Sequence, residues 1–162
     1  MAKEKTTSER GQFKGKISTA LYKNPDIRDL LLGDTSGMSA KDVQKLFKDH
    51  VKSHLFIDDT ITEAWSFIFY DVRIIRVHSN TKTAQVIMYA ICHRDILENY
   101  SKDGYFGNRA DILSQMIEDA LLNDPETVKD FGIGDLVLKS VDIYNATRFY
   151  GTIMTFEVPT FR

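Results

Sequence analysis

Two histidines four residues apart, His50 and His54, are the candidates for metal chemistry in this sequence. On a helix this spacing places both rings on one face, as a pair of metal ligands requires, and Asp58 and Asp59 follow closely. However, no glutamate general base stands between the histidines, and the helical pattern weakens near Lys52. We therefore expect no metal site and interpret the pair as a solvated helix end.

Other reactive side chains have the wrong neighbours for catalysis. Cys92 and His93 are adjacent in a run that alternates like a strand, so they point to opposite faces and cannot form a catalytic pair. We expect Cys92 to be a small core residue. Asp71 and Arg73 share one strand face, and they either pair with each other or mark where the strand leaves the core.

Known catalytic and nucleotide-binding motifs are missing. The glycines of residues 131–135 precede a predicted strand, whereas a dinucleotide fingerprint opens a helix, so we interpret this segment as a turn. The sequence has neither a nucleophile elbow nor a P-loop. Its single cysteine excludes a disulfide framework within the chain. We expect no catalytic residue, no cofactor and no metal, so function must come from shape and association.

The charge distribution divides the chain unevenly. Residues 1–16 hold two acidic residues and five basic ones, which are Lys3, Lys5, Arg10, Lys14 and Lys16. Residues 111–142 hold eight acidic residues against two basic ones. The basic arm is either a frayed terminus or a segment that becomes ordered on a neighbouring subunit or an acidic partner. We expect residues 1–16 to be a flexible arm and 17–162 to be a single domain.

Hydrophobic periodicity predicts an α+β fold. Helices are expected at residues 17–23, 24–33, 39–51 and 108–123. Strands are expected at residues 64–77, 83–93, 135–144 and 149–158. Short links make these strands two long hairpins, and together they predict an antiparallel or mixed sheet of about four main strands with helices on one face.

Aromatic residues are dense in the predicted strands. They are Trp65, Phe67, Phe69, Tyr70, Tyr89, Phe149, Tyr150 and Phe156, with Phe161 close behind. Aromatic side chains are enriched in interface cores as well as in monomer cores. Long hairpins with more apolar surface than the predicted helices cover are typical of a ring or filament subunit.

Four segments resemble the tail-terminator, or tail-to-head joining, proteins of long-tailed bacteriophages. They are NPDIRDLLLGD, HVKSHLFIDDTITEAWSFIFYDVRI, GNRADILSQMIEDALLND and IGDLVLKSVDIYNATRFYGTIMTFEVPTFR. The likeness covers residues 20–162 and does not include the basic arm. It implies an α/β subunit, with helices on one side of a sheet, in a hexameric ring that caps the tail tube.

The resemblance also implies partners and a location. The expected partners are further copies of this chain, the tail tube protein and the head-completion or connector protein, with genomic DNA passing through the channel without sequence-specific binding. The expected location is the neck of the virion, after assembly in the host cytoplasm, with no membrane contact and no catalysis. Two alternatives stay open: another particle component, such as a stopper ring, tail tube or baseplate subunit, and a small-molecule-binding protein.

A ring that lets DNA pass favours a negative lumen, because carboxylates repel phosphates within a Debye length of about 8 Å at physiological salt. The candidate lumen-facing acids are Asp111, Glu118, Asp119, Asp124, Glu126 and Asp130. The alternative is that these side chains only solvate the outer wall. The net charge of −2 also argues against a dedicated nucleic-acid-binding protein.

Overall fold

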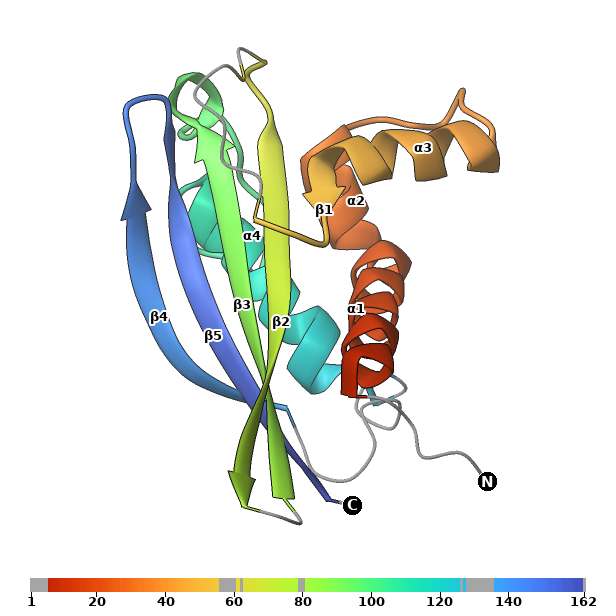
Figure 1. Cartoon of the computed structure of the whole chain (residues 1–162). Helices are drawn as coiled ribbons and strands as arrows, with labels where there is room; N and C mark the ends of the chain where they lie inside the picture. The colour runs from red at the N-terminus through yellow and green to blue at the C-terminus, as the bar shows by residue number, and fades with distance from the viewer. Residues whose placement is uncertain are drawn as a thin grey trace.

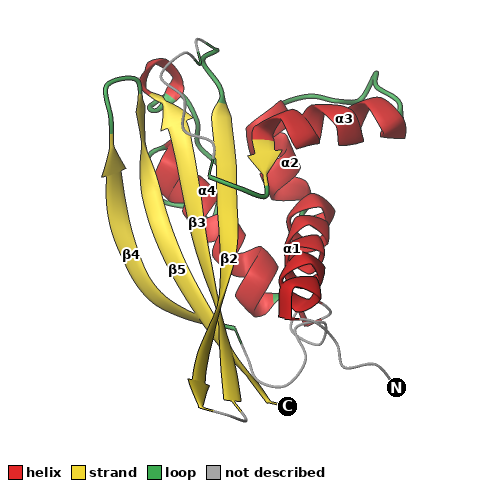
Figure 2. Cartoon of the chain, viewed as in Figure 1, coloured by secondary structure: helices red, strands yellow, loops and turns green. Residues whose placement is uncertain are grey.

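The computed structural model describes residues 6–55, 61, 63–78, 81–125, 127 and 136–161. A five-stranded sheet stands against a layer of helices (Figures 1 and 2). The α+β class is therefore confirmed.

Three polar residues begin helices where the sequence predicts them. Asn24, Ser39 and Asn108 each accept a hydrogen bond from a backbone N–H in the first turn of the following helix. The helices are α1 (Thr6–Lys23), α2 (Pro25–Leu32), α3 (Ala40–His50) and α4 (Arg109–Glu118), with a short 3₁₀ turn at Arg94–Ile96. A π-helical turn, Asp119–Asn123, continues α4.

The sheet joins two long hairpins through their inner strands. Its strands are β1 (Val51–Lys52), β2 (Ser66–His78), β3 (Thr81–His93), β4 (Val137–Asn145) and β5 (Phe149–Phe161). Their order is β1-β2-β3-β5-β4, and every pairing is antiparallel except the short parallel pairing of β1 with β2. The two hairpins were predicted; β1 was not, because two residues carry no periodicity.

Helices cover one face of the sheet, where the main core lies. This core includes Ile68, Tyr70, Val86, Met88, Met154 and Phe156 from the strands, and Ile17, Leu21, Ile112 and Met116 from the helices. On the opposite face, Phe67, Phe69, Ile91 and Phe149 form a second buried cluster, against which Ile61 and Trp65 pack. The end of the β2–β3 hairpin extends beyond the helices (Figure 1).

The expected boundary after residue 16 is wrong. Helix α1 runs through it from Thr6, and Phe13 is buried in the same core as Ile17. These two side chains are four residues apart and therefore lie on one helix face. Charged residues surround this narrow apolar face, which is why composition alone predicted a flexible arm. Lys3 and Lys5 lie outside the described residues.

Candidate functional site

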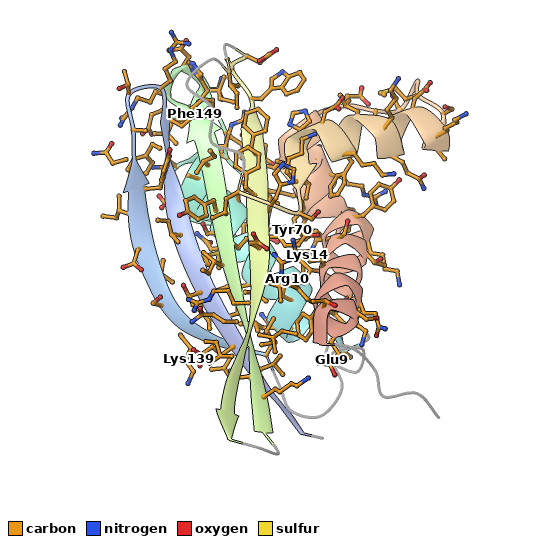
Figure 3. The ribbon with its side chains drawn as sticks, viewed as in Figure 1. Glu9, Arg10, Lys14, Tyr70, Lys139 and Phe149 are labelled. Carbon is orange, nitrogen blue, oxygen red and sulfur yellow. The ribbon has the colours of Figure 1, made fainter. Side chains whose placement is uncertain are left out.

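Two basic residues of the predicted arm bind the edge of β2. Arg10 Nη2 lies 2.6 Å and Lys14 Nζ 2.9 Å from Asp71 Oδ1. Arg10 Nε also donates to the carbonyl of Val72 at 2.6 Å, and the Tyr70 hydroxyl donates to the carbonyl of Lys14 at 2.9 Å. Figure 3 shows Arg10, Lys14 and Tyr70 between α1 and β2. Arg10 and Lys14 thus hold the chain's own helix in place.

A further ion pair joins the same helix to the sheet. Lys82 on β3 is almost fully buried, and its Nζ lies 3.1 Å from Glu9 Oε2. A buried ammonium group needs a counter-charge, which α1 supplies from its first turns. Lys16 is exposed on the same helix and remains accessible.

The described candidate lumen acids are spread along α4 and the π-helical turn that continues it, in differing surroundings. Asp111 accepts the backbone N–H of Asn108 at 3.0 Å and so completes a capping box at the start of α4. Asp119 accepts hydrogen bonds from Tyr105 and Asn123. Glu118 is half-buried and Asp124 is exposed. Glu126 and Asp130 were also predicted and lie outside the described residues.

The histidine pair separates in the structure. His50 ends α3 and is only 3% exposed, whereas His54 is exposed, so the interpretation of both as a solvated helix end is wrong for His50. Asp58 and Asp59 are not among the described residues. Within the described ranges, no three His, Cys, Asp or Glu side chains are grouped so that they could hold a metal ion.

Two other sequence interpretations can be followed to their contacts. Asp71 pairs with α1, while Arg73 points to the exposed side of the molecule. The strand β2 therefore stays within the sheet, and the carboxylate of Asp71 anchors α1 to it. Cys92 is fully buried as predicted, and burial raises the pKa of its thiol to about 12.

A cleft of about 520 Å³ opens where the C-terminal ends of α2 and α3 meet the start of β2. Its lining includes Leu30, Leu31, Leu32, Leu46, His50, Trp65, Ser66, Ile96, Tyr100 and Arg109. Such a volume is typical of small-molecule sites. Sequence reasoning missed it, because its walls come from five separate segments.

Arg109 holds one wall of this cleft together. Its guanidinium donates to the carbonyls of Leu30 and Ile96, both at 3.1 Å, and to Asn99 Oδ1 at 2.9 Å. It also stacks over Tyr100, 4.8 Å from the ring centroid. The arginine thus ties α2 to the segment before α4 and is already supplied with acceptors.

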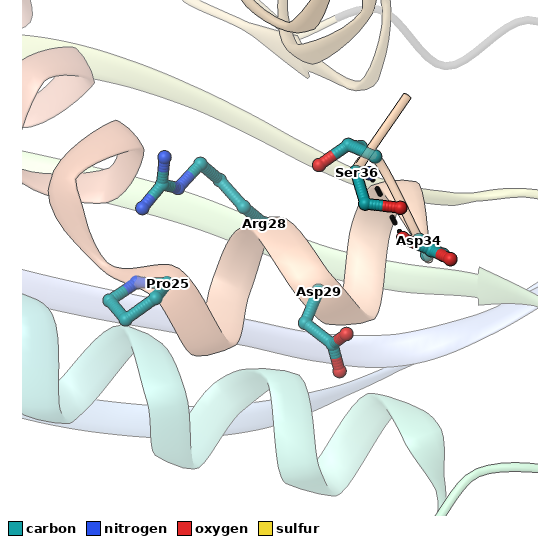
Figure 4. A pocket seen from close by; sticks show the side chains of 7 residues that line it. Pro25, Arg28, Asp29, Asp34 and Ser36 are labelled. Carbon is teal, nitrogen blue, oxygen red and sulfur yellow. Dashed lines mark hydrogen bonds between the residues drawn. The ribbon is translucent and has the colours of Figure 1, made fainter. Parts of the chain in front are cut away.

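A second hollow, of about 370 Å³, lies beside the same end of α2 (Figure 4). Arg28 and Asp29 on α2 line it together with Asp34 and Ser36, and the Ser36 N–H donates to Asp34 Oδ1 at 2.9 Å. This hydrogen bond lowers the pKa of Asp34. The arrangement is a polar turn that follows the helix stop at Gly33.

Exposed apolar side chains gather on β4. Val137, Val141 and Ile143 are 45%, 57% and 72% exposed, and β4 pairs only with β5 among the described strands. Sequence periodicity predicted the strand but not its position at the edge of the sheet. That position depends on β3 pairing with β5, a contact between distant segments.

Phe106 is another exposed apolar residue that the sequence did not single out. It is 79% exposed, yet its N–H donates to Gln115 Oε1 at 3.1 Å and its carbonyl accepts from Gln115 Nε2 at 2.6 Å. Gly104 and Gly107, both with positive φ, flank this loop. The ring is therefore presented to solvent from a fixed backbone. The two glycines were the signal in the sequence that could have indicated this tight loop.

A protein-family model matches this chain over most of its length. No helix of the described residues has both the length and the apolarity needed to cross a membrane. No curated protein is significantly similar to the chain. The model of one protein family, YomW, matches residues 17–158, which is more than half of the sequence and includes β1 to β4 and most of β5. The chain therefore belongs to the YomW family of phage-related proteins.

Proposed function

We propose that this protein is a structural subunit of a phage particle. Copies of it form a ring at the neck, which terminates the tail tube and joins it to the head connector. Membership of a phage-related family supports a role in a phage. The four-segment resemblance to tail terminators supports the neck and a hexameric ring. The single observation that carries association is the apolar, exposed edge strand β4.

The structure offers surfaces that a ring subunit needs. Apolar side chains exposed together on one strand are costly in water and stabilise an interface when a second copy covers them. Val141 and Ile143 lie two residues apart on β4 and share one strand face, next to which Leu138 packs against the core. The β2–β3 hairpin that extends beyond the helices offers a separate projection for stacking on the next ring (Figure 1).

The proposed partners follow from this role. The ring contacts further copies of the chain around its circumference, the tail tube on one side and the connector on the other. DNA passes through the lumen without sequence-specific contacts. Among the candidate acids, Asp119 and Asp124 are exposed and Glu118 is half-buried, and these three are the proposed lumen-facing side chains. Asp111 is less exposed than Asp119 and Asp124 and completes the cap of α4.

The test is the mass of the purified protein and its position in the particle. We expect a closed oligomer in mass photometry, and density for this chain at the neck in electron micrographs of the virion. Ile143→Lys should prevent the oligomer, because it places a charge in the apolar interface. Ser140→Lys, on the opposite face of the same strand, is the matched control and should assemble.

Two results would contradict the proposal. One is a chain that remains monomeric at all concentrations and is absent from the neck of the particle. The other is an oligomer that forms equally well with Ile143→Lys, which would remove β4 from the interface. Circular dichroism of both lysine variants shows whether they fold.

A further inference from the structure

His50 is held so that one ring nitrogen is fixed and the other is left open. Its Nδ1 lies 2.8 Å from the carbonyl oxygen of Ser66, which can only accept, so Nδ1 carries the proton. Trp65 stacks on the imidazole with 4.3 Å between ring centroids. The neutral ring therefore has its lone pair on Nε2.

The Nε2 lone pair is available to the cleft at the end of α2. The His50 side chain is 97% buried, and the cleft is the opening that it lines. No group in the described part of the chain donates a hydrogen bond to Nε2. Burial also lowers the pKa of His50, which keeps the ring neutral at pH 7. The cleft is therefore lined by a nearly buried imidazole whose Nε2 accepts no hydrogen bond from the described residues.

The remaining lining selects against a charged ligand. Four leucine and isoleucine side chains, Leu30, Leu32, Leu46 and Ile96, form apolar walls, and Trp65 and Tyr100 add aromatic ones. Arg109 is the cation of the cleft, and its guanidinium is already supplied with three acceptors. Asp29 already accepts from the Tyr100 hydroxyl at 3.0 Å. A charged ligand would lose its hydration here without gaining a free counter-charge.

We propose that this cleft binds a small neutral aromatic molecule that carries one hydrogen-bond donor, of the phenol class, with the donor on His50 Nε2. The ring lies between the apolar walls, and the hydroxyl donates to Nε2. The proposal does not depend on the ring function, since the cleft is complete within one chain.

The test compares phenol with toluene, which has the same ring but no donor. Trp65 is the only tryptophan in the chain and lines the cleft, so its fluorescence reports binding. We expect phenol to bind about tenfold more tightly than toluene, the effect of one hydrogen bond. In His50→Phe, phenol and toluene should bind equally.

A matched pair of variants shows where the probe binds. Ala64 lines the cleft and is exposed, so Ala64→Phe should block both ligands without disturbing the core. Ala40→Phe, exposed at the start of α3 and outside the cleft, should bind like the unmodified protein. If His50→Phe does not fold, the nitrogen-15 shift of His50 Nε2 in the unmodified protein replaces it: phenol should move this signal, and toluene should not.

Three outcomes would overturn the proposal. They are equal affinities of phenol and toluene for the unmodified protein, a preference for phenol that persists in folded His50→Phe, and binding that survives Ala64→Phe. An unmoved His50 Nε2 signal at saturating phenol has the same meaning. None of these outcomes affects the oligomer test of the proposed function.

Discussion

Arg10 Nη2 lies 2.6 Å from Asp71 Oδ1, although 61 residues separate the two in the sequence. Asp71 also accepts from Lys14 and from the N–H of Val72. Burial acts to raise the pKa of this carboxyl, but these hydrogen bonds and the positive charge of Lys14 together lower it. One carboxylate therefore fastens the N-terminal half of α1 to β2.

Asp71→Asn should destabilise the protein by about 1 kcal/mol, the upper range for a partly exposed ion pair, because both cations lose their counter-charge. Urea unfolding at low ionic strength measures this loss. The difference should shrink in 1 M salt, where the Debye length falls to about 3 Å. Lys16→Ala, an exposed change on α1, should stay within about 0.5 kcal/mol of the unmodified protein. Equal stability of Asp71→Asn and the unmodified protein would contradict the anchoring role.

Deletion of residues 1–14 should lower the thermal midpoint of the isolated subunit. The deletion removes the buried Phe13 side chain and the carboxylate of Glu9 that pairs with buried Lys82. Loss of a buried aromatic side chain alone costs about 3–5 kcal/mol. Differential scanning calorimetry checks this, with deletion of residues 1–5 as the milder comparison. An unchanged midpoint after the longer deletion would restore the flexible-arm interpretation.

Stability should decline with acidification below about pH 6.5 because of His50. Burial lowers the pKa of its imidazole, with Lys52 acting in the same direction and Ser66 and Asp49 opposing it. As the pH falls below about 6.5, the His50 imidazole is protonated in the unfolded chain but stays neutral in the folded chain. The stability present above pH 6.5 is therefore lost as the pH falls through the folded pKa. Urea unfolding at pH 7.5 and pH 5.5 measures the loss. His54→Phe should retain it and His50→Phe should reduce it; the same slope in both would exclude His50 as its source.

Two glycine-to-alanine changes should have opposite effects. A Cβ atom on Gly151 would lie 2.0 Å from the carbonyl oxygen of Ala90, so Gly151→Ala should cost about 3 kcal/mol or more by forcing β5 away from β3. Gly11 lies in α1 with open space around its Cβ position, and Gly11→Ala should stabilise by about 0.5–1 kcal/mol. Thermal unfolding of the two variants compares them directly. A tolerated Gly151→Ala would contradict the close approach of these strands.

Cys92 should resist thiol reagents in the folded protein. Its side chain is fully buried, and burial raises its pKa to about 12, so almost no reactive thiolate exists at pH 8. We expect an aromatic disulfide reagent to label the thiol at the rate of unfolding, and at once in denaturant. Fast labelling of the native protein would show that the core around Cys92 opens readily.

The sequence predicts elements that depend on local signals. The caps Asn24, Ser39 and Asn108 and the alternation in the β hairpins were sufficient to place three helices and four strands. The length of helix α1 was underestimated, because its buried face is a narrow row that includes Phe13, Ile17 and Leu21. The ion pairs that complete this face come from Asp71 and Lys82, which no local pattern connects to it.

The candidate sites depend more on distant contacts. The cleft at the end of α2 needs Trp65 and Tyr100 brought together with His50, and the edge position of β4 needs the pairing of β3 with β5. Local spacing paired His50 with His54, but His50 donates to Ser66 instead. The environment of this histidine depends on its burial. Hydrophobic periodicity does not predict how deeply the end of a helix is buried.

The two side chains bound to Val72 have a consequence for aggregation. Asp71 accepts the Val72 N–H at 2.8 Å, and Arg10 donates to its carbonyl, so this part of β2 has no backbone group to offer an incoming strand. The other end of the sheet, β4, has no such cover from the described residues. An incoming strand therefore meets open backbone groups at β4 and none at Val72. Fibril growth needs two open edges on every copy, and the contacts at Val72 interrupt one of them.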